Sequence, residues 1–145
     1  MVLKPQDSAA AEALETPLPG EAPQAYVQRV TLAKLRAGLE RAEAAGFNHT
    51  PVLASDTTVA HANEILGKPA NADDARRMLR TLSGQVHEVF TAVAITSDAE
   101  ASPLLQVSRS EVKFAPLTEA WIDWVIATGE PMDKAGAYAI QGHAA

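Results

Sequence analysis

The stretch from Val86 to Phe114 places the strongest constraint on what this chain can fold into. Val86 to Thr96 and Leu104 to Phe114 are rich in β-branched and apolar residues and have the length of strands. The residues between them, Ser97 to Pro103, are polar and typical of a turn. This pattern predicts two strands joined as a β-hairpin, so the fold is expected to contain a sheet.

Three other stretches have the spacing of amphipathic helices, and each has a recognisable start or stop signal. They are Glu21 to Ala45 with Gly46 as its stop, the stretch between the N-cap Asn71 and Ser83-Gly84, and the stretch from the cap Thr118 to Thr128. Pro51 to Ala60 is short and β-branched, which predicts another strand. Residues 1–20 have no clear pattern. The mixture of helices and strands favours a single α/β or α+β domain with a mixed sheet.

Composition narrows the function classes. The 145 residues carry a formal net charge of −6, whereas a broad surface for a nucleic-acid polymer needs a basic face. The chain has no cysteine, which excludes disulfides, thiolate metal sites and a cysteine nucleophile. No apolar run has the length of a membrane span, and we expect no signal peptide, in keeping with the cytoplasm. A few lysines with a divalent metal can still hold a small anion such as a triphosphate.

Asp56 is the most informative single position. A carboxylate within an otherwise apolar, strand-like segment is costly to bury unless it has a partner. One interpretation is a capping or turn aspartate at the strand end. The other is a metal ligand or general base at a strand terminus, which is a common place for sites in α/β proteins.

Lys68, Lys34 and Gln141 are further candidates, and each has a plain structural alternative. Lys68 lies in Gly-Lys-Pro, where glycine admits a ligand close to the backbone and proline stiffens the loop, but it can equally be a solvated loop lysine. Lys34 interrupts an apolar helix stretch and can simply extend to water. Gln141 can read a nucleobase edge or bond a neighbouring loop backbone. The histidines have no zinc-site spacing, and His87 is expected to be a structural hydrogen-bonding residue.

Taken in order, the motifs resemble those of one family. They are Glu15-Thr16-Pro17, Tyr26-Val27-x-Arg29 with Lys34 following, Ala54-Ser55-Asp56-Thr57, Leu66-Gly67-Lys68-Pro69, Met78-Leu79-x-x-Leu82-Ser83-Gly84-x-x-His87, and Asp133-Lys134-Ala135-Gly136-Ala137-Tyr138 with Ile140-Gln141-Gly142. This series resembles the Maf family of nucleotide pyrophosphatases over roughly residues 14–145. The last motif is similar to the branch that prefers dTTP and UTP, and it differs from the branch that acts on 7-methyl-GTP.

The resemblance implies a mixed twisted sheet flanked by helices, related to the inosine-triphosphate pyrophosphatases. It also implies an enzyme that cleaves nucleoside triphosphates between the α- and β-phosphates with a divalent metal, Mg²⁺ or Mn²⁺. By the same resemblance, Asp56 is the proton acceptor, Glu15 and Asp56 bind the metal, and Lys34 and Lys68 contact phosphate. Thr57 and Gln141 match positions tied to base selectivity, and a homodimer is one expected assembly.

Two departures from the family pattern bear on these expectations. The family's first segment, Ser-x-Ser-x-Arg-Arg, grips the triphosphate, whereas here no arginine precedes Arg29. The family also continues past Gln-Gly, whereas this chain stops at Ala145. We therefore expect a single domain over residues 1–145 that is truncated at both ends. The alternative to an active enzyme is a weak or inactive nucleotide-binding or protein-interaction remnant of that family.

Overall fold

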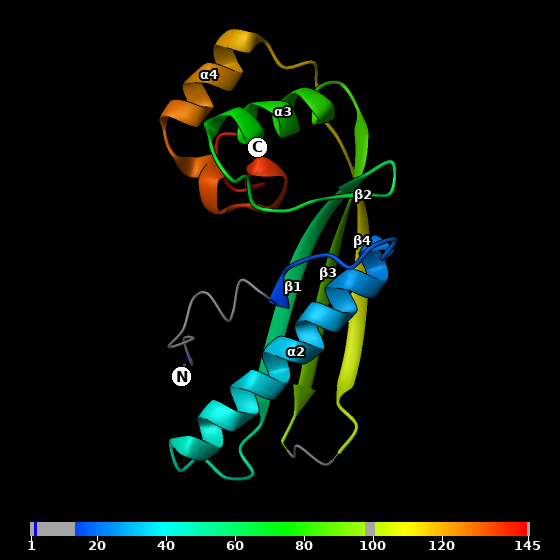
Figure 1. Cartoon of the computed structure of the whole chain (residues 1–145), viewed down its shortest axis with the longest axis vertical. Helices are drawn as coiled ribbons and strands as arrows, with labels where there is room; N and C mark the ends of the chain where they lie inside the picture. The colour runs from blue at the N-terminus through cyan, green and yellow to red at the C-terminus, as the bar shows by residue number, and fades with distance from the viewer. Residues whose placement is uncertain (1, 3–13, 98–100, 145) are drawn as a thin grey trace. The chain divides into compact units, whose positions relative to one another are not determined.

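The computed structural model describes residues 2, 14–97 and 101–144 (Figure 1). The unpatterned leader and the tip of the predicted hairpin fall partly outside these residues. The chain divides into two compact units: unit 1 comprises Met1–Asp56 and Thr91–Ser108, and unit 2 comprises Thr57–Phe90 and Arg109–Ala145. A single domain over residues 1–145 stays a prediction. No helix in the described part of the chain is long and apolar enough to cross a bilayer.

The sheet has four strands in the order β2-β1-β3-β4. They are β1 (Val52–His61), β2 (Glu64–Leu66), β3 (Val86–Thr96) and β4 (Leu104–Lys113). β3 has the predicted bounds, and β4 follows it as its antiparallel neighbour (Figure 1), which confirms the predicted hairpin. Together with the helices, this sheet confirms the α/β class expected from the sequence.

β2 is a short strand that the sequence pattern did not predict. It pairs antiparallel with β1, and Val59 lies opposite Leu66. The connecting turn uses Ala62 and Asn63, which have φ angles of 48° and 68°. Two successive positive φ angles are what a tight two-residue hairpin turn requires. This turn therefore lets β2 fold back on β1 and adds an edge strand to the sheet.

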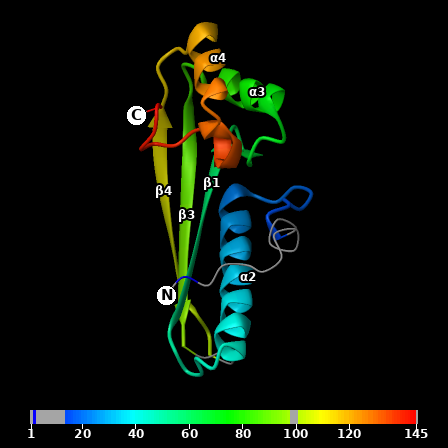
Figure 2. The same cartoon turned by 90° about the vertical axis from the view of Figure 1, so that its left-hand side faces the viewer.

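Unit 1 is built around α2 (Pro23–Ala44), which begins two residues later than predicted because Pro23 occupies its first turn. Figure 2 shows this helix running along the strands, and both Ala92 and Ala94 of β3 are fully buried in this unit. A Cβ atom at Gly38 would lie 3.0 Å from Val52 Cγ1. The small residue therefore lets α2 pack closely on β1.

The buried face of α2 follows a helical spacing. It consists of Pro23, Tyr26, Val27, Val30, Thr31, Leu35, Gly38 and Ala42. Gly46 follows the helix with a φ of 81°, a left-handed conformation that favours glycine, so the predicted stop signal is confirmed.

Unit 2 contains α3 (Ala72–Leu82), α4 (Glu119–Ala127) and two short 3₁₀ turns, η1 (Glu130–Asp133) and η2 (Ala135–Ala137). Both predicted caps form: Asn71 Oδ1 accepts from Asp74 N at 2.9 Å, and Thr118 Oγ1 accepts from Trp121 N at 3.2 Å. Apolar side chains from these elements and from β1, β2 and the end of β4 make one core. Its members are Val59, Leu66, Ala75, Met78, Leu79, Leu82, Phe114, Ile122, Val125, Ala137 and Tyr138.

His87 joins this core as the structural hydrogen-bonding residue that the sequence suggested. Its side chain is 1% exposed, and Nε2 lies 2.7 Å from Tyr138 Oη. The imidazole also makes edge-to-face contacts with the rings of Phe114 and Tyr138. Burial, together with the charge of His61, lowers the pKa of His87.

This burial predicts a dependence of stability on pH. The pKa of His87 is below 6.5 in the folded chain, so the unfolded chain binds more protons as the pH falls through about 6.5. We expect the free energy of unfolding to be highest above that pH and to fall below it, as measured by urea unfolding between pH 8 and 5. The variant His87→Leu should lose much of this slope, whereas His49→Gln, at an exposed histidine, should keep it. An unchanged slope in His87→Leu would contradict the assignment.

Gly136 gives a second prediction. Its φ is 69°, and a Cβ atom there would lie 2.8 Å from Val59 Cγ1. Gly129 has a similar φ of 77° but open space around it. We expect Gly129→Ala to lower the free energy of unfolding by about 1 kcal/mol through backbone strain. Gly136→Ala should lower it by roughly 1–3 kcal/mol more through overpacking, as compared by urea unfolding. Equal losses for the two variants would show that the contact with Val59 is unimportant.

Candidate functional site

Three of the predicted site residues meet in unit 1. Lys34 Nζ lies 2.6 Å from Asp56 Oδ1 and 2.7 Å from Glu15 Oε1. The side chains are partly buried, with exposed fractions of 29% for Lys34, 24% for Glu15 and 12% for Asp56. We call these three residues the Lys34 cluster. One ammonium group thus holds two carboxylates that come from separate parts of the chain.

The side-chain periodicities of the helix and the strand explain why Lys34 and Asp56 meet. Lys34 and Gly38 are four residues apart and share a face of α2, while Val52 and Asp56 share a face of β1. The close approach of Gly38 to Val52 shows that these two faces oppose each other. Asp56 is therefore directed toward the helix, and Lys34 lies one turn from Gly38 where it meets Asp56.

The location of Asp56 corrects the sequence analysis. Both interpretations placed it at the end of a strand, but β1 runs from Val52 to His61, so Asp56 lies in its interior. The observed strand has nearly the bounds predicted for it, Pro51 to Ala60, so Asp56 falls in its middle and not at its end. The expectation that a carboxylate there needs a partner is confirmed, because Lys34 supplies one.

The charges of the Lys34 cluster keep the lysine protonated. Burial by itself lowers the pKa of Lys34, but the hydrogen bonds to Asp56 and Glu15, with the charges of both carboxylates, outweigh it. The pKa of Lys34 is consequently raised above its ordinary value of 10.5. The protonated Lys34 is therefore a charged partner of both carboxylates.

The donor set also suits a hard divalent metal. Mg²⁺ is usually held by one or two carboxylates together with substrate phosphates and water. Glu15 and Asp56 supply two such carboxylates, close enough to share one ammonium group. Within the described ranges, no group of three or more histidine, cysteine, aspartate and glutamate side chains is arranged to hold a metal.

Lys68 belongs to unit 2, where it is exposed in the loop after β2. The backbone of Gly136 donates to the carbonyl of Gly67 at 3.1 Å, which ties this loop to η2. Lys134 Nζ lies 2.7 Å from Asp133 Oδ1. The hydrogen bond from Lys134, with the charges of Lys134 and Lys68, lowers the pKa of Asp133. Two lysines thus lie near one carboxylate, and Lys134 forms an ion pair with it.

Thr57 and Gln141 also belong to unit 2, and both are exposed. Thr57 follows Asp56 in β1 and points to the opposite face of the strand. The loop that carries Gln141 is held by Glu130, whose Oε1 accepts from His143 N at 3.1 Å. A Cβ atom at Gly142 would collide with the same carboxylate, so this glycine allows the close approach.

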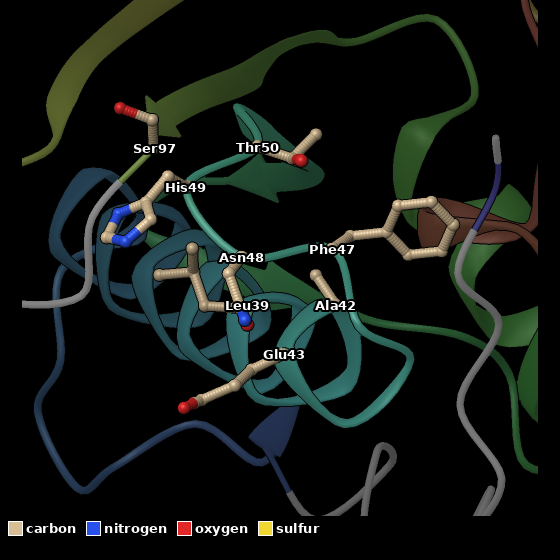
Figure 3. Close-up of a pocket in the computed structure, with 8 residues that line it drawn as sticks. All are labelled: Leu39, Ala42, Glu43, Phe47, Asn48, His49, Thr50 and Ser97. Carbon is tan, nitrogen blue, oxygen red and sulfur yellow. The ribbon is translucent and has the colours of Figure 1, made fainter.

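A pocket of about 320 Å³ opens at the C-terminal end of α2 in unit 1 (Figure 3). It is lined by Leu39, Ala42, Glu43, Phe47, Asn48, His49, Thr50 and Ser97. None of the predicted site residues is among them. Sequence reasoning assigned these residues no role, and the pocket is separate from the Lys34 cluster.

Sequence reasoning also assigned no role to Tyr26 and Arg29, although both belong to a quoted motif. Tyr26 Oη donates to the backbone carbonyl of Glu15 at 2.7 Å. The sequence did contain one signal of this shared contact. Tyr26 and Arg29 are three residues apart, so they lie on one face of the helix and can contact the same adjacent segment.

The fold is that of an α/β protein with a partly buried carboxylate–lysine cluster in unit 1. Residues 2–145 match the sequence family described as Maf-like protein. A protein of Polaromonas sp. named dTTP/UTP pyrophosphatase is 53% identical over 143 residues, which cover 99% of this chain and 70% of that protein. This chain therefore belongs to the Maf-like protein family.

Two other relatives carry the same name. The dTTP/UTP pyrophosphatase of Ralstonia nicotianae is 53% identical over 135 residues, covering 93% of this chain and 65% of that protein. That of Burkholderia lata is 53% identical over 145 residues, covering 99% of this chain and 69% of that protein. The chain thus spans about two thirds of the length of these relatives.

The Lys34 cluster predicts that the lysine stabilises the fold. In Lys34→Met, the carboxylates of Glu15 and Asp56 lose their shared partner and repel each other. We expect the free energy of unfolding at pH 7 to fall by about 1–3 kcal/mol, as measured with urea. Adding Glu15→Gln to that variant should restore part of the loss. Lys113→Met, at an exposed lysine of β4, should change stability little; a loss as small in Lys34→Met would contradict the argument.

Proposed function

We propose that this chain is a nucleoside triphosphate pyrophosphatase that hydrolyses dTTP and UTP to the nucleoside monophosphate and pyrophosphate with a divalent metal. The observation that carries the proposal is the Lys34 cluster, in a chain about half identical to proteins named dTTP/UTP pyrophosphatase. Two carboxylates and a lysine are the groups that hydrolysis of a phosphoanhydride needs, because the reaction depends mainly on positioning and charge stabilisation.

In the proposed reaction, water is added across the bond between the α- and β-phosphates. Asp56 orients this water and accepts its proton. Glu15 and Asp56 would hold the metal, Mg²⁺ or Mn²⁺. When bound, such an ion draws charge from phosphate oxygens and makes water a better nucleophile. Lys34 lies between these carboxylates, where its ammonium group offsets charge on the phosphate oxygens.

Three further residues have proposed roles that rest on the family resemblance and on their own chemistry. Lys68 is proposed to contact phosphate from its glycine–proline loop, as the family resemblance implies. Gln141 is proposed to recognise the base, because its amide both donates and accepts and so complements the donor and acceptor edge of thymine or uracil. Thr57 is proposed to assist in that selection. The proposed place of action is the cytoplasm, and a homodimer stays a prediction.

The test is pyrophosphate release from dTTP, UTP, CTP and 7-methyl-GTP with Mg²⁺ or Mn²⁺. We expect dTTP and UTP to be hydrolysed fastest and Asp56→Asn to lose roughly 10²–10⁴-fold in kcat/KM. Asp123→Asn is the matched control, since Asp123 is an exposed aspartate paired with Arg76. No release from folded protein on any substrate would refute the proposal and leave a nucleotide-binding remnant.

A further inference from the structure

Side chains of α2 hold three consecutive backbone carbonyls of the segment that carries Glu15. Tyr26 Oη donates to the carbonyl of Glu15 at 2.7 Å. Arg29 Nη1 donates to the carbonyl of Leu14 at 3.3 Å, and Arg29 Nη2 donates to that of Thr16 at 3.0 Å. A backbone outside sheet pairing must find such partners elsewhere, and here two side chains supply them.

Arg29 is itself held in place by Glu21. Its Nε and Nη2 lie 2.6 Å and 2.8 Å from the two carboxylate oxygens of Glu21, which is a bidentate pair. The hydrogen bond from Arg29 lowers the pKa of Glu21 to about 2. The guanidinium carbon also lies 5.5 Å from the centre of the Tyr26 ring. The Arg29–Glu21 pair therefore stays charged at any ordinary pH, and it holds the guanidinium group beside the Tyr26 ring.

A tight turn brings Glu21 back to Arg29. Glu21 N donates to the carbonyl of Leu18 at 3.0 Å, and Leu18 N donates to Glu21 Oε2 at 3.0 Å. Pro19 and Gly20 occupy the central positions, and Gly20 has a φ of 73°. Proline followed by a glycine with positive φ is typical of a type II turn. The chain from residue 14 to residue 21 is thus fixed at both ends on the start of α2.

Tyr26 is placed to act as a donor to the Glu15 backbone. Its side chain is buried, and its hydroxyl group lies 2.7 Å from the carbonyl oxygen of Glu15. A carbonyl oxygen can only accept, so the phenol donates in this hydrogen bond. Because the Glu15 carbonyl is fixed, the Glu15 side chain can reach only a limited region. Its carboxylate contacts Lys34 there, at 2.7 Å.

We propose that Tyr26 and Arg29 are positioning residues: by clamping the carbonyls of Leu14, Glu15 and Thr16, they hold the Glu15 carboxylate on Lys34 beside Asp56. The catalytic meaning of this clamp rests on the proposed function, whereas its effect on the Lys34 cluster does not. Arginine is required because its planar group presents several donors in fixed directions, which a lysine cannot reproduce. Tyrosine is required for its hydroxyl group.

The first test needs no activity. It compares the ¹⁵Nζ resonance of Lys34 by NMR in the full chain and in variants shown to be folded by circular dichroism. Glu15→Gln defines the shift caused by loss of that partner. We expect Tyr26→Phe and Arg29→Lys to move the resonance in the same direction by at least half as much. Thr31→Val and Arg36→Lys are controls on the same helix and should leave it unmoved, since Thr31 has a buried hydroxyl without a partner and Arg36 is exposed.

The second test is kinetic. With dTTP, the clamp variants should raise the Mg²⁺ concentration for half-maximal rate and lower kcat, each by roughly tenfold. The KM for dTTP at saturating Mg²⁺ should change much less, because neither residue is expected to touch the nucleotide. The two control variants should match the unmodified chain in all three parameters.

The outcomes separate the two proposals. An unmoved Lys34 resonance in both folded clamp variants overturns the clamp, whatever the activity. A moved resonance with unchanged Mg²⁺ dependence and kcat in an active protein overturns its positioning role. A moved resonance in a chain that releases no pyrophosphate refutes the proposed function and leaves the clamp standing as the device that orders the Lys34 cluster. Tyr26→Phe removes one hydroxyl only, so the test remains decisive if Arg29→Lys fails to fold.

Discussion

The contact on which the arrangement of unit 1 depends is the one between Lys34 and two carboxylates. Asp56 lies inside a strand and faces a helix, where an ionised carboxylate without a partner would be strongly unfavourable. Lys34 removes that cost, and Glu15 completes the arrangement from a segment outside the sheet. The three groups depend on one another. The packing of α2 on β1 and the position of residues 14–16 are therefore coupled through the Lys34 cluster.

The cluster also combines both signs of charge in a protein whose net charge is negative. One ammonium group contacts two carboxylates, and all three side chains remain partly open to solvent. The metal-bound triphosphate that we propose as substrate would meet groups of both charges there. The backbone next to the cluster has specific partners as well, because Tyr26 and Arg29 donate to the carbonyls of Glu15 and Thr16.

Unit 2 shows a different way of fixing functional residues. Here the candidates lie on loops, and the loops are held by close backbone approaches that only glycine allows. Gly136 lies against Val59 and donates to the carbonyl of Gly67, next to Lys68. Gly142 lies against the Glu130 carboxylate, next to Gln141. In both places a glycine next to a candidate residue allows a close contact, so the glycines of these motifs have a structural role of their own.

The sequence by itself determined the local elements and most of the candidate residues. The helix caps at Asn71 and Thr118 act over a few residues, as does the β-branched and apolar composition of Val86 to Thr96. These features can therefore be recognised without the fold. Tertiary structure alone decided which partners these residues take. The contact of Lys34 with Asp56 spans 22 positions, and that of His87 with Tyr138 spans 51. Such pairings depend on how helix and strand faces oppose each other in space, and neither periodicity nor motif spacing encodes that.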